Sequence, residues 1–132
     1  MSGYTVKHLD ETTNLFEGNY PGEMRLATYE IGAEQAAFSY RRMPQHTGGK
    51  GSYGHRHKTQ EEIYFVMSGK LQFKLDDEVL ELGAGHVVRV APQTARSVWN
   101  DEPEDAELII VSRRVEGGSA EDAEYVSDFW PS

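Results

Sequence analysis

The most informative part of this chain is GKGSYGHRHKTQEEIYFVMSG, residues Gly49–Gly69. It begins with a glycine-rich segment, continues with two histidines two positions apart, and ends in a run of β-forming residues closed by a glycine. Alternate side chains of a strand point to the same face, so His55 and His57 project together. The run Glu61–Ser68 is rich in β-branched and aromatic residues and predicts a strand directly after the histidines.

The segments on either side have the same short-strand character. They alternate apolar and polar residues or are rich in β-formers, and turns separate most of them. The predicted strands are Tyr4–His8, Met24–Tyr29, Ala36–Met43, Glu61–Ser68, Lys70–Leu75, Glu78–Leu82, His86–Ala91, Ala95–Asn100 and Glu107–Val115. Residues 44–54 are expected to form a glycine-rich loop. No stretch keeps a helical period over a useful length, so the sequence predicts an all-β fold, a sandwich or a small antiparallel β-barrel.

The chain is expected to form one domain with three regions. Residues 1–35 are expected to form an irregular N-terminal segment with short strands, and residues 36–115 the barrel. Residues 116–132 are an acidic C-terminal tail that ends in Phe129, Trp130 and two small residues. Two adjacent aromatic side chains would leave a large apolar area in water, so we expect the tail to pack on the barrel or on a partner subunit.

Composition excludes several classes of function. The chain contains no cysteine, which rules out disulfides, zinc–thiolate sites, iron–sulfur clusters and cysteine nucleophiles. Its 22 acidic and 13 basic residues give a formal net charge of −9, which disfavours binding to nucleic acid or to an anionic membrane. The N-terminal stretch lacks the apolar core of a signal peptide, and no apolar run is long enough to span a bilayer, so we expect a cytoplasmic protein.

The two histidines and one of the glutamates that follow them form a candidate metal site. If the strand after the histidines pairs beside them, either Glu61 or Glu62 can complete a set of two imidazoles and one carboxylate. Such a set, with open coordination positions, suits iron(II), manganese, nickel or zinc. The competing interpretation is a pair of ordinary surface histidines on a strand, because His-x-His alone is not a specific signal.

The spacing of this stretch resembles the first motif of the cupin superfamily. That motif has a glycine, five residues, His-x-His, three or four residues, a glutamate, six residues and a glycine. These positions fall here at Gly49, His55, His57, Glu62 and Gly69. The resemblance implies a small conserved β-barrel, or jelly roll, over roughly residues 36–115, and it selects Glu62 as the inward carboxylate and third metal ligand.

The segment Gly83–Asn100 is similar to the second cupin motif. In that motif a glycine opens a strand, a proline turn follows, and a histidine stands four residues before an asparagine; Gly85, Pro92 and Asn100 occupy the corresponding places. The resemblance makes the histidine the fourth metal ligand, but this chain has Arg96 instead. The whole run resembles small single-domain cupins of the type 2 conserved-barrel group with an arginine at this position, most of them without an assigned activity.

Arg96 leaves three arrangements open. Arginine stays protonated and offers only donors, so it cannot ligate a cation, and a buried guanidinium needs a partner. It can pair with Glu62 and leave no metal site. It can bind a substrate carboxylate or phosphate beside a metal held by His55, His57 and Glu62. It can also turn outward to the acidic surface and leave the fourth position vacant.

Four other side chains have weaker claims. Tyr64 shares the inward face with Glu62 and is either a substrate-binding group with its hydroxyl in the site or a core tyrosine with a satisfied hydroxyl. His86 either supplies a fourth nitrogen or is an ordinary turn histidine, and His46 is a loop residue that can lie over the mouth of the barrel. Trp99 is expected to point outward and to be covered, which favours a homodimer.

Two functions are compatible with a small-molecule cavity inside the barrel. In the first, His55, His57 and Glu62 hold a divalent metal and Arg96 binds an anionic substrate. The resemblance associates that arrangement with dioxygenase, isomerase or decarboxylase chemistry. In the second, the protein is a non-catalytic, metal-free binding module in which Arg96 pairs with Glu62 or with a bound carboxylate. The sequence does not decide whether the protein is an enzyme, because one fold supports many activities.

Overall fold

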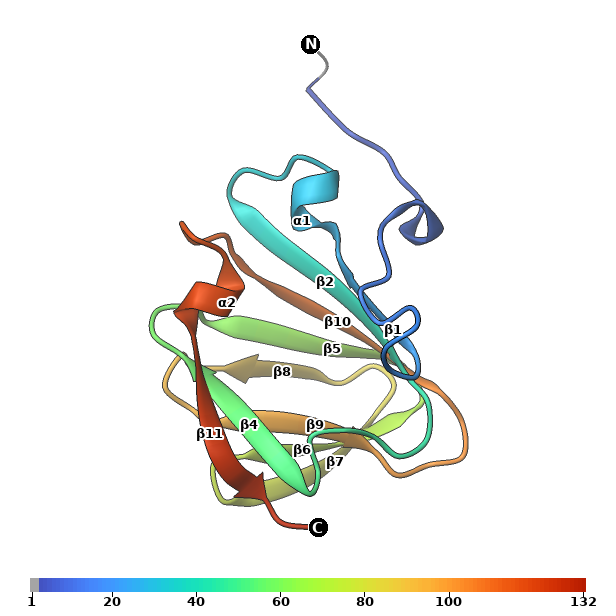
Figure 1. Cartoon of the computed structure of the whole chain (residues 1–132), viewed down its shortest axis with the longest axis vertical. Coiled ribbons are helices and arrows are strands. Elements are labelled where there is room, and N and C mark those ends of the chain that lie inside the picture. Colours follow the sequence, from blue (N-terminus) through green and yellow to red (C-terminus); the bar gives the residue numbers. More distant parts are fainter. Residues whose placement is uncertain (1–2) are drawn as a thin grey trace.

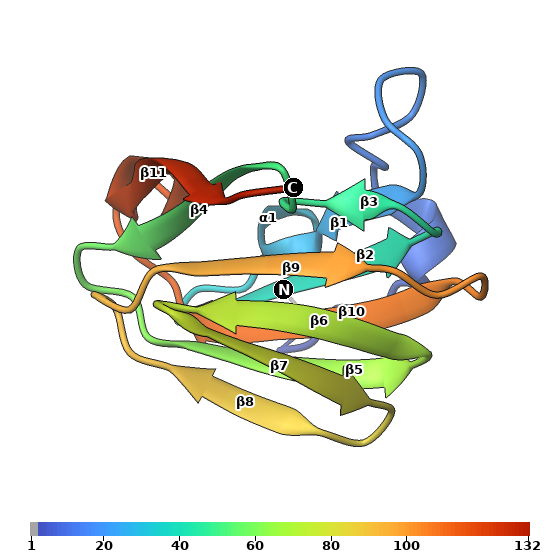
Figure 2. The same ribbon diagram turned by 90° about the horizontal axis from the view of Figure 1, so that it is seen from below.

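Two antiparallel β-sheets pack against each other in the computed structural model, which describes residues 3–132 (Figure 1). One sheet has the strand order β1-β2-β10-β5-β8, and the other has the order β11-β4-β9-β6-β7, with β3 paired to β9. The strands are β1 (Glu23–Leu26), β2 (Ala36–Met43), β3 (Thr47–Gly48), β4 (Ser52–His57), β5 (Glu62–Ser68), β6 (Lys70–Leu75), β7 (Glu78–Gly83), β8 (Val87–Val90), β9 (Arg96–Asn100), β10 (Ala106–Arg113) and β11 (Ala123–Trp130). Figure 2 shows β9, β6 and β7 side by side in one layer, with β2 and β10 behind them.

Helical structure is confined to short turns. They are the 3₁₀ turn η1 (Leu9–Glu11) and the helices α1 (Ala27–Glu30) and α2 (Ser119–Asp122). In the part of the chain that the structure describes, no helix has the length and apolar character needed to cross a membrane.

The alternation of side chains along β5 shows how the core is built. Every second residue from Glu62 to Val66 is buried between the sheets, and the residues between them are exposed. The buried apolar cluster consists of Met43, Tyr64, Val66, Leu71, Phe73, Val90, Val98, Ala106 and Leu108. These side chains come from both sheets, so their removal from water holds the two layers together. The all-β antiparallel fold expected from the sequence is confirmed.

The predicted strands between residues 36 and 115 correspond to β2 and to β5 through β10, with bounds that differ by at most two residues. Two strands were missed in this region, the two-residue strand β3 and the longer β4. β4 begins at Ser52, inside the segment expected to be a loop. It was not predicted because glycine and serine have low strand propensity, although pairing with β11 and β9 on either side holds the backbone in a strand.

Two expectations for the N-terminal region were wrong. The range Tyr4–His8 forms no strand, because its apolar side chains are exposed and lie on no sheet in the described structure. The range Met24–Tyr29 is divided, since β1 ends at Leu26 and α1 follows. Oγ1 of Thr28 accepts the backbone N–H of Phe38 at 2.9 Å, so a side chain takes the place of the next ladder hydrogen bond.

The C-terminal residues form α2 and the strand β11, which pairs with β4 (Figure 1). The sequence pattern did not indicate this strand. Trp130 at its end is 5% exposed. Phe129 lies over Gly54, where a Cβ atom would come within 2.4 Å of the phenyl ring and 2.7 Å of the Arg96 carbonyl oxygen. The glycine immediately before His55 therefore lets β4 lie between β11 and β9.

Replacement of Trp130 tests whether β11 is part of the folded unit. Trp130→Ala removes a buried aromatic side chain, and we expect it to lower the free energy of unfolding by about 3 kcal/mol, measured by urea denaturation. Tyr125→Ala is the matched control on the same strand, because Tyr125 is 71% exposed; its effect should stay below about 1 kcal/mol. Equal, small effects of the two substitutions would show that β11 does not stabilise the barrel.

Candidate metal site

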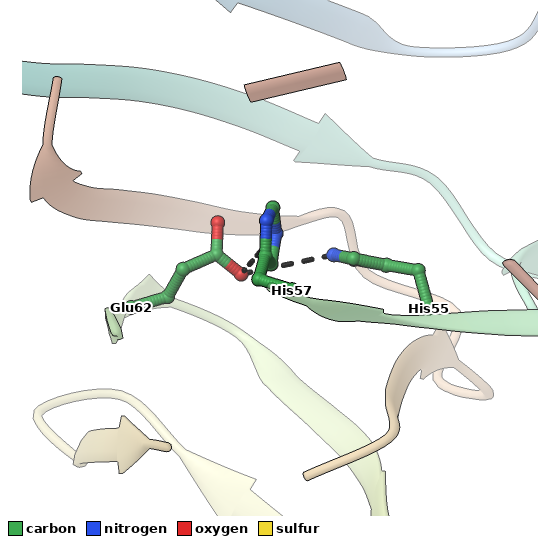
Figure 3. A group of neighbouring side chains, drawn as sticks. All are labelled: His55, His57 and Glu62. Atoms are coloured by element: carbon green, nitrogen blue, oxygen red, sulfur yellow. Dashed lines mark ion pairs between the residues drawn. The ribbon is translucent and has the colours of Figure 1, made fainter. Parts of the chain in front are cut away.

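His55 and His57 of β4 and Glu62 of β5 bring their side chains together between the two sheets. One ligand atom from each lies within 4.8 Å of the others. Nε2 of His57 is 3.4 Å from Oε1 of Glu62, and Nε2 of His55 is 3.7 Å from the same oxygen. Figure 3 shows both imidazoles directed at this carboxylate. The three side chains singled out by their spacing in the sequence thus form one cluster.

The position of Glu61 explains why Glu62 is the carboxylate of the cluster. Glu61 immediately precedes β5, is exposed, and forms an ion pair with Arg89 of β8. Glu62 is the first residue of β5, points between the sheets and is 8% exposed. Because neighbouring strand residues face opposite ways, only one of the two glutamates can reach the histidines.

A fourth side chain, Asp122 at the end of α2, contacts the ring nitrogen of His57 that faces away from Glu62. Its Oδ2 lies 3.1 Å from Nδ1 of His57, and the same carboxylate accepts the backbone N–H groups of Thr59 and Gln60 and the hydroxyl of Thr59. Burial opposes ionisation, but these hydrogen bonds outweigh it and lower the pKa of Asp122 to about 2. An ionised Asp122 can only accept, so Nδ1 of His57 carries the proton and Nε2 is directed to Glu62.

Nε2 of His57 is buried and has no hydrogen-bond partner among residues 3–132. The pKa of Glu62 lies well below its usual value, because contacts with His55, His57 and Tyr64 overcome the effect of burial. A carboxylate oxygen and an imidazole lone pair 3.4 Å apart repel unless a cation or a second proton lies between them. Two nitrogens and one carboxylate, with a further carboxylate supporting one histidine, form a donor set that can hold a divalent metal ion.

Arg96 points inward from β9, and its side chain is 1% exposed. Nη2 donates to the carbonyl oxygen of Ala91 at 3.0 Å, and Nε lies 3.8 Å from Oε1 of Glu62. Nε and Nη1 are buried without a hydrogen-bond partner in the described structure. The outward arrangement considered for Arg96 is therefore wrong. A bidentate pair with Glu62 is also not formed, since the single 3.8 Å contact is too long for a hydrogen bond.

Tyr64 is a core tyrosine whose hydroxyl is satisfied inside the cluster. Its ring packs edge-on against Phe73 in the core, with ring centres 5.7 Å apart, and its hydroxyl donates to Oε1 of Glu62 at 2.7 Å. Burial, followed by the nearby Glu62 carboxylate, raises the pKa of Tyr64 well above its usual value. The hydroxyl therefore keeps its proton and acts as a donor that fixes the orientation of the carboxylate.

The remaining histidines do not join the cluster. His86 is exposed, and its Nδ1 lies 2.8 Å from the carbonyl oxygen of Gly83, as expected of a turn histidine. His46 stacks on Trp99 with ring centres 6.1 Å apart. Trp99 is half-buried and donates to the Asp101 carboxylate at 3.3 Å.

The cluster opens into a cavity of about 1020 Å³ between the sheets. Its walls include all five site residues, His55, His57, Glu62, Tyr64 and Arg96, and residues of the N-terminal segment, α1 and the start of β11. Several tyrosines and Phe16 also line it, and among residues 3–132 Glu62 is its only carboxylate. The dimensions suit a small organic molecule.

The family model of the cupin domain matches residues 42–112, more than half of the chain. The chain belongs to the cupin family. A curated relative, an uncharacterised protein of Methanocaldococcus jannaschii, is 35% identical over 46 residues. That match covers 35% of this cupin and 37% of the relative, so the chain spans little more than a third of the relative's length.

Solved structures with this fold come from several bacteria. A cupin protein from Bacteroides fragilis has a TM-score of 0.68 at 22% identity, with 88% of each chain covered. A predicted oxalate decarboxylase from Thermotoga maritima has a TM-score of 0.65 at 20% identity and covers 83% of this cupin and 99% of that chain. A putative sugar phosphate isomerase from Acidithiobacillus ferrooxidans has a TM-score of 0.61 at 17% identity, with coverage of 82% and 64%. At these identities the similarity shows the fold alone.

Asp122 was missed by the sequence analysis, because 65 residues separate it from His57 and no spacing rule joins them. Asp122→Asn keeps the shape but leaves the amide free to present a donor to Nδ1, which favours the wrong tautomer of His57. We expect a 10- to 100-fold loss of divalent-metal affinity, measured by competition with a chromogenic chelator. Glu121→Gln, at the exposed neighbouring position, should leave the affinity unchanged. Equal affinities of Asp122→Asn and the unmodified protein would contradict a role for Asp122 in orienting His57.

Proposed function

We propose that this cupin is a divalent-metal-dependent enzyme that acts on a small anionic molecule in its barrel, with dioxygenase or isomerase chemistry. The observation that supports the metal most directly is Nε2 of His57, which is buried without a hydrogen-bond partner among residues 3–132. Asp122 holds the proton of this imidazole on Nδ1, so Nε2 presents a lone pair. His55, His57 and Glu62 would hold the ion. Iron, manganese, nickel or zinc at this position supplies Lewis acidity, and a redox-active metal supplies electron transfer as well.

Arg96 is the proposed substrate-binding residue. Two of its donors, Nε and Nη1, are buried without acceptors, and a buried guanidinium with unpaired donors is costly unless an anion arrives. A substrate carboxylate or phosphate beside the metal ligands would accept from both donors. Two fold neighbours are described as a predicted oxalate decarboxylase and a putative sugar phosphate isomerase, whose names imply anionic substrates. Those descriptions support an anionic substrate and do not choose the reaction.

Tyr64 and Asp122 have supporting roles in this proposal. Tyr64 donates to Glu62, so it keeps the carboxylate directed at the histidines. Asp122 fixes the ring of His57 and its tautomer. Both contacts are made by buried side chains on paired strands or next to them, so the donor set is preorganised before any ligand binds.

The alternative function is a metal-free binding cupin in which Arg96 neutralises Glu62 or a bound carboxylate. The observation in its favour is the 3.8 Å contact between Nε of Arg96 and Oε1 of Glu62. Opposite unit charges at that distance attract by roughly 4 kcal/mol at an effective dielectric constant of 20. In this arrangement Arg96 neutralises the charge of the Glu62 carboxylate, and His55 and His57 bind no metal ion.

Metal content separates the two functions. Protein purified without an affinity tag or added nickel should contain close to one equivalent of a divalent metal by plasma mass spectrometry. His57→Ala should lose it, because one of three ligands is removed. His86→Ala is the matched control and should retain the metal, since His86 is exposed and bonded only to Gly83. If no metal binds even after iron(II), manganese, nickel or zinc is supplied, the metal-free alternative holds.

Substitution of Arg96 tests the effect of its charge on the metal. The guanidinium repels a cation held by the neighbouring ligands, so Arg96→Gln should raise metal affinity by tenfold or more, about 1.4 kcal/mol. Arg96→His should raise it further, because an imidazole adds a fourth donor. Both variants should lose affinity for small carboxylates. A fall in metal affinity in Arg96→Gln would mean that Arg96 is needed to position Glu62, and would count against this proposal.

A further inference from the structure

A second arginine faces the cavity without a carboxylate partner. Arg41 lies on β2, and the inward residues of this strand, Ala37, Ser39 and Arg41, line the cavity. Phe38 and Tyr40 alternate with them and face the other side of the sheet. Tyr40 is buried on that other face, so the face toward the cavity carries small and charged groups where a ligand would lie.

The neighbouring Arg42 shows how unusual Arg41 is. Arg42 points away from the cavity and forms ion pairs with Glu23 at 2.7 Å and Asp105 at 2.8 Å. Arg41 forms no ion pair within residues 3–132, and its Nε is buried without a hydrogen-bond partner. Its guanidinium lies 5.5 Å from the ring centre of Phe16, a contact that stabilises the cation but satisfies none of its donors.

Arg41 and Arg96 act on the same part of the cavity. Both side chains line its wall. They enter from opposed sheets, Arg41 from β2 and Arg96 from β9.

The charges that line the cavity do not balance. Within the described part of the chain, Glu62 is the only carboxylate in the wall, whereas Arg41, Arg96 and Arg114 are cationic. The chain as a whole has a net charge of −9. Arg114 is satisfied at the rim, since it donates to the Ala33 carbonyl oxygen and stacks on Tyr29. Two inward guanidinium groups with unused donors remain, Arg41 on β2 and Arg96 on β9.

We infer that the ligand of this cavity carries two separate anionic groups, one bound by Arg96 and the other by Arg41, joined by an organic spacer that lies against the aromatic walls. This inference rests on the proposed function in one respect, the anionic group bound at Arg96. It adds a second anionic group, bound at Arg41, and thereby names the class of substrate. Dicarboxylates and phosphorylated carboxylic acids have this chemistry. A guanidinium binds either group through two parallel hydrogen bonds.

The test compares α,ω-dicarboxylates of increasing length, from oxalate to adipate, with monocarboxylates of the same carbon number by isothermal titration calorimetry. Metal-free protein is used, because dicarboxylates chelate metal ions. At least one dicarboxylate should bind tenfold or more tightly than its matched monocarboxylate. Arg41→Met should abolish that preference and leave monocarboxylate affinity within about threefold. Arg42→Met, which removes an outward arginine of the same strand, should keep the preference.

The inference is overturned if no dicarboxylate binds better than its monocarboxylate, or if Arg41→Met lowers both affinities equally. In the latter case Arg41 is a structural residue that stacks on Phe16. Urea denaturation of each variant checks that it folds. If Arg41→Met does not fold, the comparison of the two acid series on the wild-type protein still decides the question. A dicarboxylate preference in a protein that never takes up metal would support this inference while the enzyme proposal fails.

Discussion

One carboxylate oxygen, Oε1 of Glu62, organises the interior of this cupin. It accepts the Tyr64 hydroxyl at 2.7 Å, and the nearest nitrogens of His57, His55 and Arg96 lie 3.4, 3.7 and 3.8 Å away. Only the tyrosine contact is a hydrogen bond by length. The three nitrogens are close enough to interact electrostatically with the carboxylate and too far away to form hydrogen bonds with it. That spacing leaves room for a cation beside Glu62 and leaves the donors of Arg96 free.

Much of the fold could be predicted, because it depends on local patterns. Short alternating segments separated by turns specified β2 and β5–β10, and the His-x-His spacing placed two imidazoles on one face. The choice of Glu62 over Glu61 needed more than alternation, since either parity was open until the cupin motif fixed it. β4 and β11 were missed because their strand character comes from pairing with each other and with β9, which a linear pattern does not report.

The missing parts of the site share a physical cause. Asp122 contacts His57 across 65 residues of sequence, and its carboxylate looks like one more acidic residue in an acidic segment. The direction of Arg96 depends on which groups the opposite sheet presents. Arg41 was hidden for a further reason. Arg41 and Arg42 are adjacent on β2, and alternation alone does not say which of them faces inward. The structure directs Arg41, together with Ser39, toward the cavity.

The opposite charges of surface and cavity have a consequence for selectivity. A net charge of −9 repels anions at long range, yet the field of surface charges falls off over about 8 Å at physiological ionic strength. Inside the cavity the nearest charges are the arginines and a single glutamate, at low dielectric and with little screening. In the proposed site, a monoanion would pair with one guanidinium and leave the other unpaired, whereas a ligand with two anionic groups would pair with both. The same argument couples ligand and metal, because an anion at Arg96 cancels the charge that opposes a cation at Glu62. Anion and metal should therefore each strengthen the binding of the other, as reciprocal linkage requires.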